Sequence, residues 1–141
     1  MRRAEIVAFR QKIERVFDKA AVNMNREEMI LARDLCKPWE PGAHTVGEHF
    51  TADGQLWTCF QAYNNAIYPD IRPGNAAWFT FNRPYHGTSR ETAMPWVRPT
   101  GAHDIYQTGE YMVYTDGKLY RCRQGTNFSP DEYAPAWEVQ T

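Results

Sequence analysis

Long hydrophobic runs and a strong charge of either sign are both missing from this chain. No apolar stretch approaches the length of a membrane-spanning helix. A formal net charge of −1 gives no electrostatic footprint for nucleic acid. The apolar residues 6–9 lie between Arg2-Arg3 and a polar stretch at 10–12, which is too short and too charged for a signal peptide. We therefore expect no membrane insertion, no nucleic-acid partner and synthesis in the cytoplasm without a signal peptide.

The side chains that catalysis needs are also scarce. Only two serines occur, Ser89 and Ser129, and neither lies in a nucleophile-elbow sequence. Asp131 and Glu132 are neighbours in the chain, whereas a glycosidase needs two carboxylates that face each other across a cleft. There is no C-x-x-C motif, and the four histidines show no metal-ligand spacing with the cysteines: His44, His49, His86 and His103. We therefore expect a protein that is not an enzyme and that carries no cofactor and no metal.

Cysteine is rare, and its count is odd, with Cys36, Cys59 and Cys122 as the three residues. Cys59 and Cys122 occupy equivalent positions of an internal repeat. We interpret the cysteines as small buried hydrophobic residues and not as disulfide partners. This interpretation fits synthesis in a reducing compartment.

What the chain does contain is a repeat that fills its last hundred residues. The offset between the copies is 63 positions from Phe50 to Gln61, which pairs Phe50 with Val113. A unit of about 42 residues is too small for most enzymes and is a common size for a binding module. The paired positions are Trp39/Trp96, Ala43/Ala102, His44/His103, Gly47/Gly109, Asp53/Asp116, Gly54/Gly117, Leu56/Leu119, Trp57/Tyr120, Cys59/Cys122, Gln61/Gln124 and Trp78/Trp137.

Residues 3–22 before the repeat have the pattern of an amphipathic helix. Its apolar positions are spaced 3, 4, 3 and 4 apart, as in an a/d stripe of two heptads, at Ile6, Phe9, Ile13, Val16 and Ala20. Such a stripe must be buried against the next helix, a repeat, or the same helix of another subunit. The segment 25–28, Asn-Arg-Glu-Glu, is a capping box that begins a second, short helix before Pro38. We expect residues 1–37 to form a helical attachment segment and to mediate homo-oligomerisation.

Each repeat has the pattern of a small β module. Asp53-Gly54 and Asp116-Gly117 lie between strand-like runs and are strong hairpin signals. Because so small a unit cannot bury a large core, the repeated aromatic residues are expected to form it: Trp39, Trp57, Trp78, Trp96, Tyr120 and Trp137. The predicted fold is mainly β with an N-terminal α segment, followed by two three-stranded, aromatic-cored modules. The predicted boundaries are 38–81 for the first module, 82–95 for a linker and 96–141 for the second module.

The loops that follow the two cysteine strands are the candidate ligand-binding regions. Flat rings there can stack on sugar faces while amides bond the hydroxyl groups, and a second module raises avidity. The alternative is that these rings cover the small cores. The candidate residues are Tyr63, Asn64, Tyr68, Asn127, Phe128 and Tyr133.

In these residues the chain resembles the chitin-binding type-3 fold, carbohydrate-binding module family five and twelve. The second copy carries the pattern as Trp96, Tyr106-Gln107-Thr108-Gly109, Val113, Gly117, Leu119-Tyr120 and Trp137. The first copy carries it as His44-Thr45-Val46-Gly47, Phe50, Gly54, Leu56-Trp57 and Trp78. The resemblance spans residues 39–80 and 96–139 and implies a module that binds chitin or a similar polysaccharide.

One segment departs from that family. Its chitinase-borne members carry an Ala-Lys-Trp-Trp-Thr type segment after the Leu-Tyr strand, and its paired rings form the sugar platform. In this chain the platform rings are replaced by Gln61-Ala62 and by Gln124-Gly125. The resemblance therefore speaks more for the fold than for chitin as the ligand.

The whole arrangement is also similar to small proteins of tailed bacteriophages and prophages of Gram-positive bacteria. The stretches 86–89, 101–104 and 109–118 carry this similarity. It implies a viral protein made in the bacterial cytoplasm, which lies in the virion tail or outside the cell after release. It also implies a role in host attachment through a bacterial surface polysaccharide. The alternative is a structural tail-assembly protein whose modules and helices bind other virion proteins.

Overall fold

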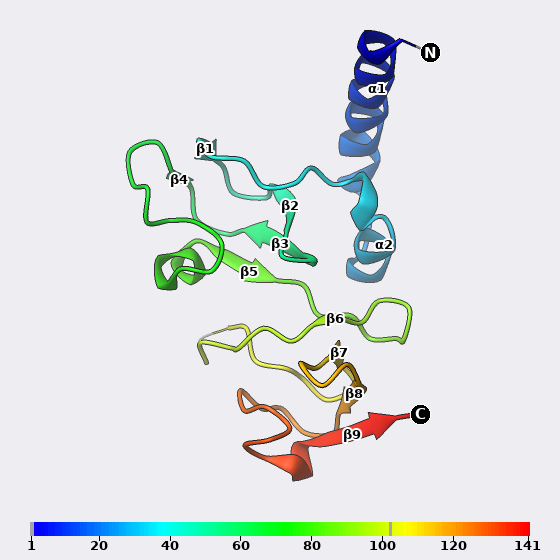
Figure 1. Ribbon diagram of the computed structural model, residues 1–141, viewed down its shortest axis with the longest axis vertical. Coiled ribbons are helices and arrows are strands. Elements are labelled where there is room, and N and C mark those ends of the chain that lie inside the picture. The colour runs from blue at the N-terminus through cyan, green and yellow to red at the C-terminus, as the bar shows by residue number, and fades with distance from the viewer. Residues whose placement is uncertain (1, 102) are drawn as a thin grey trace.

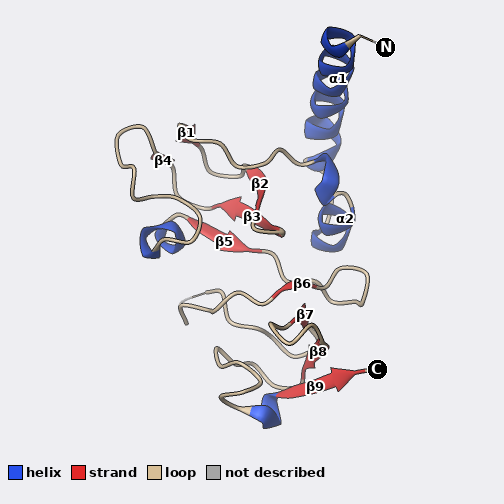
Figure 2. Ribbon diagram, in the orientation of Figure 1, coloured by secondary structure: helices blue, strands red, loops and turns tan. Residues whose placement is uncertain are grey.

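The computed structural model describes residues 2–101 and 103–141, so the pairing of Ala43 with Ala102 lies outside the described residues. The N-terminal helix stands at one end of the molecule, and the small β-sheets of the two modules follow in chain order along its long axis (Figures 1 and 2). This arrangement confirms the predicted fold class. The elements are α1 (Arg3–Ala21), α2 (Arg26–Leu31), η1 (Arg33–Leu35), β1 (Ala43–His44), β2 (His49–Ala52), β3 (Gln55–Cys59), β4 (Tyr63–Asn64), η2 (Ala76–Thr80), β5 (Asn82–Pro84), β6 (Met94–Pro95), β7 (Tyr111–Val113), β8 (Leu119–Cys122), η3 (Ala134–Ala136) and β9 (Trp137–Gln140).

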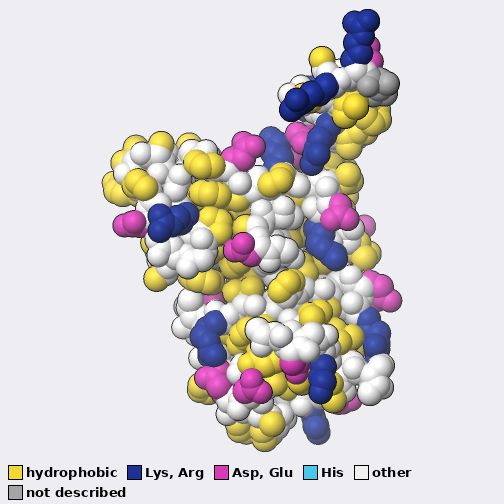
Figure 3. Space-filling model, in the orientation of Figure 1, with side chains coloured by type: hydrophobic (Ala, Val, Ile, Leu, Met, Phe, Trp, Pro, Cys, Tyr) yellow, Lys and Arg dark blue, Asp and Glu magenta, His cyan; other side chains and the backbone are white. Residues whose placement is uncertain are grey.

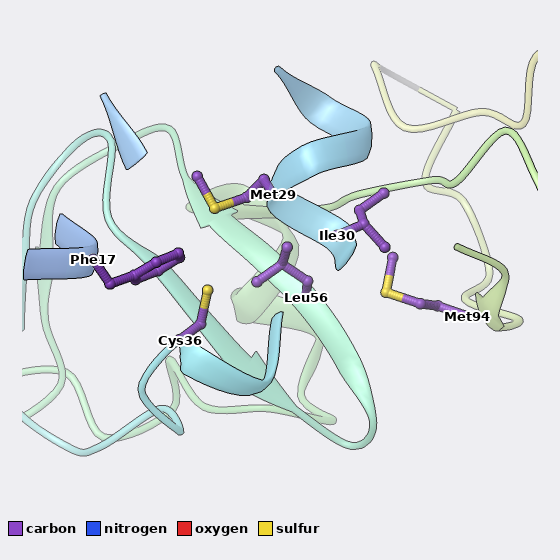
Figure 4. Close-up of a cluster of buried hydrophobic side chains, with 6 residues drawn as sticks. All are labelled: Phe17, Met29, Ile30, Cys36, Leu56 and Met94. Atoms are coloured by element: carbon purple, nitrogen blue, oxygen red, sulfur yellow. The ribbon is translucent and has the colours of Figure 1, made fainter. Parts of the chain in front are cut away.

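The predicted capping box begins α2. The Asn25 side-chain oxygen accepts a hydrogen bond from the Glu28 amide at 2.9 Å, and the Glu28 carboxylate accepts one from the Asn25 amide at 3.1 Å. Both helices then contribute to a buried cluster with β3 and β6, which we call the helical cluster (Figure 4). It consists of Phe17, Met29, Ile30, Cys36, Leu56 and Met94. The segment 1–37 is therefore tied to the β modules by its second half, while the first turns of α1 project away from them (Figure 1).

The first module is built on the antiparallel sheet β2-β3-β5, with the two-stranded ladder β1-β4 beside it. Its hairpin turns at Asp53 and Gly54, both at positive φ (55° and 75°), as a two-residue turn of type I′ requires. The third strand, β5, comprises Asn82–Pro84 and pairs with β3. Strand β5 therefore falls in the segment assigned to the linker. The first three residues of that segment are extended and belong to the sheet.

The second module is the four-stranded sheet β6-β7-β8-β9. The prediction of three strands is wrong here, because Met94 and Pro95 from the end of the assigned linker pair in parallel with β7. The first module has the same feature in reduced form, as a single parallel bridge between Pro38 and Thr51. Each module thus begins with a Pro-Trp step that runs alongside its first hairpin strand.

Backbone hydrogen bonds show that the two modules are built alike. The Gly47 amide donates to the Cys59 carbonyl, and the Gly109 amide donates to the Cys122 carbonyl, each at 2.9 Å. The two glycines have nearly the same positive φ, 94° and 92°. The duplicated sequence therefore corresponds to a duplicated structure, and the two copies form separate sheets.

The register of the copies differs from the constant offset of 63 positions. Phe50 is buried opposite Trp57, and the residue buried opposite Tyr120 is Met112. The pairing of Phe50 with Val113 is therefore wrong by one position. The reason is that the turn of the second hairpin is longer than the two-residue turn of the first.

The pairing of His44 with His103 is also wrong. The His44 ring stacks on Trp39 with 5.7 Å between ring centroids, and the ring that stacks in this way on Trp96 is Tyr106, at 5.2 Å. His103 instead packs edge-on against Phe60 of the first module, at 4.6 Å. His44 and Tyr106, each three positions before an equivalent glycine, are therefore the matching residues of the two copies.

Each module has an aromatic cluster, as predicted. Trp78 packs edge-on against Trp57 at 5.3 Å, and Trp137 packs edge-on against Tyr106 at the same distance. Of the six expected core residues, three are buried (Trp57, Trp78 and Trp137), and three are half-buried against the clusters (Trp39, Trp96 and Tyr120). Trp78 lies in η2, whereas Trp137 lies in β9 itself, so the two rings reach equivalent places from different backbone positions.

Candidate functional site

The loop between β3 and β5 in the first module is longer than its counterpart between β8 and β9. Amide side chains hold it in shape. Asn64 accepts a hydrogen bond from the Ala66 amide at 2.9 Å, and Asn65 donates to the Ile71 carbonyl at 2.7 Å. A long surface loop that is fixed in this way can present side chains in a defined arrangement.

This loop borders a hollow of about 420 Å³, which we call the loop hollow. Most of its lining is apolar, and Asp70 supplies a carboxylate. Ile67 and Tyr68 remain 65% and 62% exposed, and hydrophobic side chains gather on the lobe beside β1 and β4 in Figure 3. The residues that define the hollow are Tyr63, Ile67, Tyr68, Asp70, Ala77 and Phe81.

The three candidate residues of the first module have three different roles. Tyr63 is buried, its hydroxyl accepts a hydrogen bond from Trp39 Nε1 at 2.9 Å, and burial raises the pKa of this hydroxyl. Its ring stacks on His44 at 5.0 Å and forms part of the core, although it also borders the loop hollow. Asn64 caps the loop, as described above. Only Tyr68 presents an exposed aromatic ring to the hollow.

The candidate residues of the second module lie on its loop without forming a shared surface of this kind. Asn127 is half-buried, while Phe128 and Tyr133 are 50% and 40% exposed. Among the described residues, no aromatic pair joins these two rings. The Phe128 carbonyl accepts a hydrogen bond from Trp137 Nε1 at 3.0 Å, which ties the loop to the core. The structure therefore brings Tyr63 and Tyr68 together and leaves the three residues of the second module apart from them.

An ion pair covers one face of the Trp96 ring in the second module. The Arg98 guanidinium lies 5.6 Å from the Trp96 ring centroid and pairs with Glu132. The hydrogen bond from Arg98 lowers the pKa of Glu132 to about 2. Glu132 is therefore a charged partner of Arg98, and its neighbour Asp131 accepts a hydrogen bond from the Tyr114 hydroxyl at 2.9 Å.

Sequence reasoning missed several residues that shape the loop hollow. Ile67 stands directly before Tyr68, so an apolar pair in an otherwise polar loop was the available signal. Ala77 lies in η2 and Phe81 directly follows this helix, about ten positions further along. No local sequence pattern places them beside Tyr68, because they reach it only when the loop folds back against the sheet.

A buried charged cluster lies where α2, the assigned linker and the second module meet. Glu110 is 4% exposed and pairs with Arg26 of α2 at 2.8 Å. Its other oxygen lies 3.0 Å from His86 Nδ1 and accepts a hydrogen bond from the Gln107 amide at 2.7 Å. The His86 ring stacks on Tyr106 at 3.8 Å. This cluster connects three parts of the chain, and a hollow of about 270 Å³ lies beside it.

The described residues contain no group of three or more histidine, cysteine or acidic side chains placed to hold a metal ion. All three cysteines are buried as free thiols. Within residues 2–101 and 103–141, no helix combines the length and the apolar character that a membrane span needs. Comparison with protein-family models and with curated proteins finds no match for this chain.

Proposed function

We propose that this protein is a non-catalytic carbohydrate-binding protein that binds a bacterial surface polysaccharide. The observation that supports this most directly is Tyr68, whose ring is 62% exposed at the edge of the loop hollow. The loop that carries it is held by side-chain hydrogen bonds, so little ordering is required on binding.

The chemistry of the loop hollow suits a sugar ring. Aromatic and aliphatic side chains offer flat apolar contacts to the C–H face of a pyranose, while Asp70 can accept hydrogen bonds from its hydroxyl groups. The volume of about 420 Å³ falls within the usual range of small-ligand sites. The hollow differs from the two-ring platform of the chitin-binding family, so we favour a bacterial glycan over chitin as the ligand.

The similarity to bacteriophage and prophage proteins supports a place in the virion tail, or outside the cell after release. A polysaccharide on the host surface presents many copies of the same sugar unit. A weak single site would then gain its effective affinity from several copies of the protein on one particle.

The test is retention of the purified protein on Gram-positive cell-wall polysaccharide, with chitin as a second matrix. We expect Tyr68→Ala to weaken binding about tenfold, which corresponds to ~1.4 kcal/mol. Phe128→Ala is the matched control, because it removes a similarly exposed ring from the loop of the second module. If the parent protein binds neither matrix, the proposal of carbohydrate binding is wrong.

A second function is favoured by one observation. The apolar face of α1 is exposed before Phe17, at Ile6, Phe9, Ile13 and Val16. A structural tail-assembly protein would use such a face to bind other virion proteins. Co-purification of the intact protein with disassembled tails, and its loss on Phe9→Glu substitution, would support this role.

A further inference from the structure

The part of α1 before Phe17 extends beyond the body of the molecule, and its apolar side chains stay in solvent. Phe9 and Val16 are 59% and 67% exposed, although both belong to the stripe that the sequence marks as a packing face. Figures 1 and 3 show this part of the helix standing clear of the modules. An isolated helix of this length is marginally stable in water, so a partner along the stripe would stabilise it.

The stripe lies beside the face of α1 that contacts the body and does not coincide with it. Phe17 is buried in the helical cluster. Glu14 and Arg10 lie on the same face of α1 as Phe17, one and two turns closer to its N-terminus. At about 100° per residue, the stripe lies roughly a quarter of a turn from this side. A second helix can therefore pack along Ile6, Phe9, Ile13 and Val16 without displacing the contacts of Phe17.

The heptad pattern identifies a second copy of this chain as a fitting partner. Ile6 and Ile13 take the a positions and Phe9 and Val16 the d positions of one heptad repeat. Such a stripe is self-complementary, because each side chain fits between four residues of an identical helix.

The flanking charges select the orientation of the pair. In a parallel pair, Glu5 at g faces Arg10 at e of the second copy, and these charges attract. In an antiparallel pair with a opposite d, Glu5 faces Lys19, but Arg10 faces Arg10 and Lys12 faces Lys12. The like-charge contacts there offset the attractive ones, whereas the parallel pair has only attractive contacts. The Arg10–Glu14 pair within one helix is loose, at 3.6 Å and in solvent, and leaves Arg10 able to turn.

We infer that α1 packs in parallel against α1 of a second copy of this chain, so that the β modules of the assembly lie at one end of the helices. This inference goes beyond the proposed carbohydrate binding and does not rest on it. It also implies that several loop hollows lie at the same end of one assembly.

Light scattering on the full chain after size exclusion tests the association. We expect the parent protein to have a mass of two or more chains. The double variant Phe9→Glu, Ile13→Glu is expected to have the mass of one chain, with the far-ultraviolet signal of its sheets and its thermal transition retained. The matched control Gln11→Glu, Arg15→Glu adds two acids to the other side of α1 and should keep the parent mass. A monomeric parent, or an assembly that persists in the double variant, overturns the inference.

Disulfide trapping tests the orientation, because the native cysteines are buried. In a parallel pair, Ile6→Cys lies beside Ile6→Cys of the second copy, and mild oxidation should give a cross-linked band on a non-reducing gel. In an antiparallel pair, Ile6 lies opposite Val16. A cross-link that forms only when Ile6→Cys and Val16→Cys proteins are mixed therefore overturns the parallel arrangement.

Discussion

Gly87 lies against the backbone of the segment that follows it, where an added Cβ atom would overlap the Thr92 carbonyl oxygen. Its own carbonyl accepts a hydrogen bond from the Tyr111 amide at 2.9 Å, which attaches this segment to β7. The absence of a side chain at Gly87 therefore allows the assigned linker to pack on the second sheet. Neither Thr92 nor the sheet can move away easily, because Thr92 is 1% exposed.

We predict that Gly87→Ala lowers the free energy of unfolding by about 2 kcal/mol, as overpacking of a close contact does. Gly125→Ala is the matched control, because the nearest atom to its Cβ would lie at 3.5 Å and its φ is not positive. That variant should stay near the parent value. Urea unfolding followed by tryptophan fluorescence measures both, and equal losses would contradict the packing described for Gly87.

The buried thiols give a pH dependence with a defined sign. Burial raises the pKa of Cys36 and Cys122 to about 11, from an ordinary value near 9. Between these two values the unfolded chain has lost thiol protons that the folded chain keeps. Folding stability due to these groups is therefore complete below about pH 9 and is lost as the pH rises towards 11.

The matching experiment compares urea midpoints at pH 8, 9.5 and 10.5. We predict a progressive fall above pH 9, together with slow reaction of all three thiols with a thiol reagent at pH 8 in the folded state. Rapid reaction before unfolding would contradict the burial of Cys36, Cys59 and Cys122.

At the scale of elements, α2 is short but central. Its two buried residues, Met29 and Ile30, pack beside Leu56 of the first module and Met94 of the second sheet (Figure 4). A six-residue helix has little stability of its own, so the capping box and this packing account for its formation.

Ile30→Ala is predicted to cost about 3 kcal/mol of folding stability, because it leaves a cavity at a fully buried position. Leu31→Ala removes a similar side chain from the next position, which is 62% exposed, and should change stability by less than about 0.5 kcal/mol. Thermal unfolding of both variants measures the difference. Similar melting temperatures would place α2 outside the folded core.

Elements with strong local signals could be predicted from the sequence, and those made by distant pairing could not. The helix predicted over residues 3–22, the capping box at Asn25 and the turn at Asp53-Gly54 each depend on neighbouring residues, and each occurs as expected. Strand β5 was missed because Asn82–Pro84 has no alternating pattern and is held only by its pairing with β3. The register of the copies was off by one because a longer turn, invisible to a fixed offset, separates the strands of the second hairpin.

In the candidate site, too, the features set by neighbouring residues could be predicted and those made by distant contacts could not. The exposure of Tyr68 agrees with its place in a polar loop, whereas Tyr63, four positions after Cys59, turns inward to the core. Phe81 borders the hollow from far along the chain. Composition identified the loop. Which of its aromatic rings stay exposed depends on how η2 packs back against the loop, and the sequence does not show this packing.

At the scale of the whole molecule, polar contacts join α2 to the second module and to the assigned linker that precedes it. Arg26 pairs with Glu110 at 2.8 Å, and Glu27 accepts hydrogen bonds from the Thr88 amide and hydroxyl at 2.7 and 2.6 Å. The helical cluster joins the same helix to the first module. We therefore expect the two modules to influence each other's stability through α2.

Glu110→Gln tests this connection. We predict a loss of ~2 kcal/mol, less than for a fully buried pair because Arg26 is half-exposed. The loss should appear in the unfolding of the second module and of α2 together, measured by amide hydrogen exchange. Glu138→Gln removes the same charge from an exposed position of β9 and should leave exchange rates unchanged. A loss confined to residues near Glu110 would show that the modules are independent.

The most direct measurement of the central proposal is a titration of the ¹⁵N-labelled protein with fragments of cell-wall polysaccharide, followed by amide chemical shifts. We predict that the shifts concentrate on the loop hollow, around Ile67, Tyr68, Ala77 and Phe81, and that Tyr68→Ala removes them. An unchanged spectrum at saturating glycan, or shifts confined to the loop of Asn127, Phe128 and Tyr133, would contradict carbohydrate binding at this site.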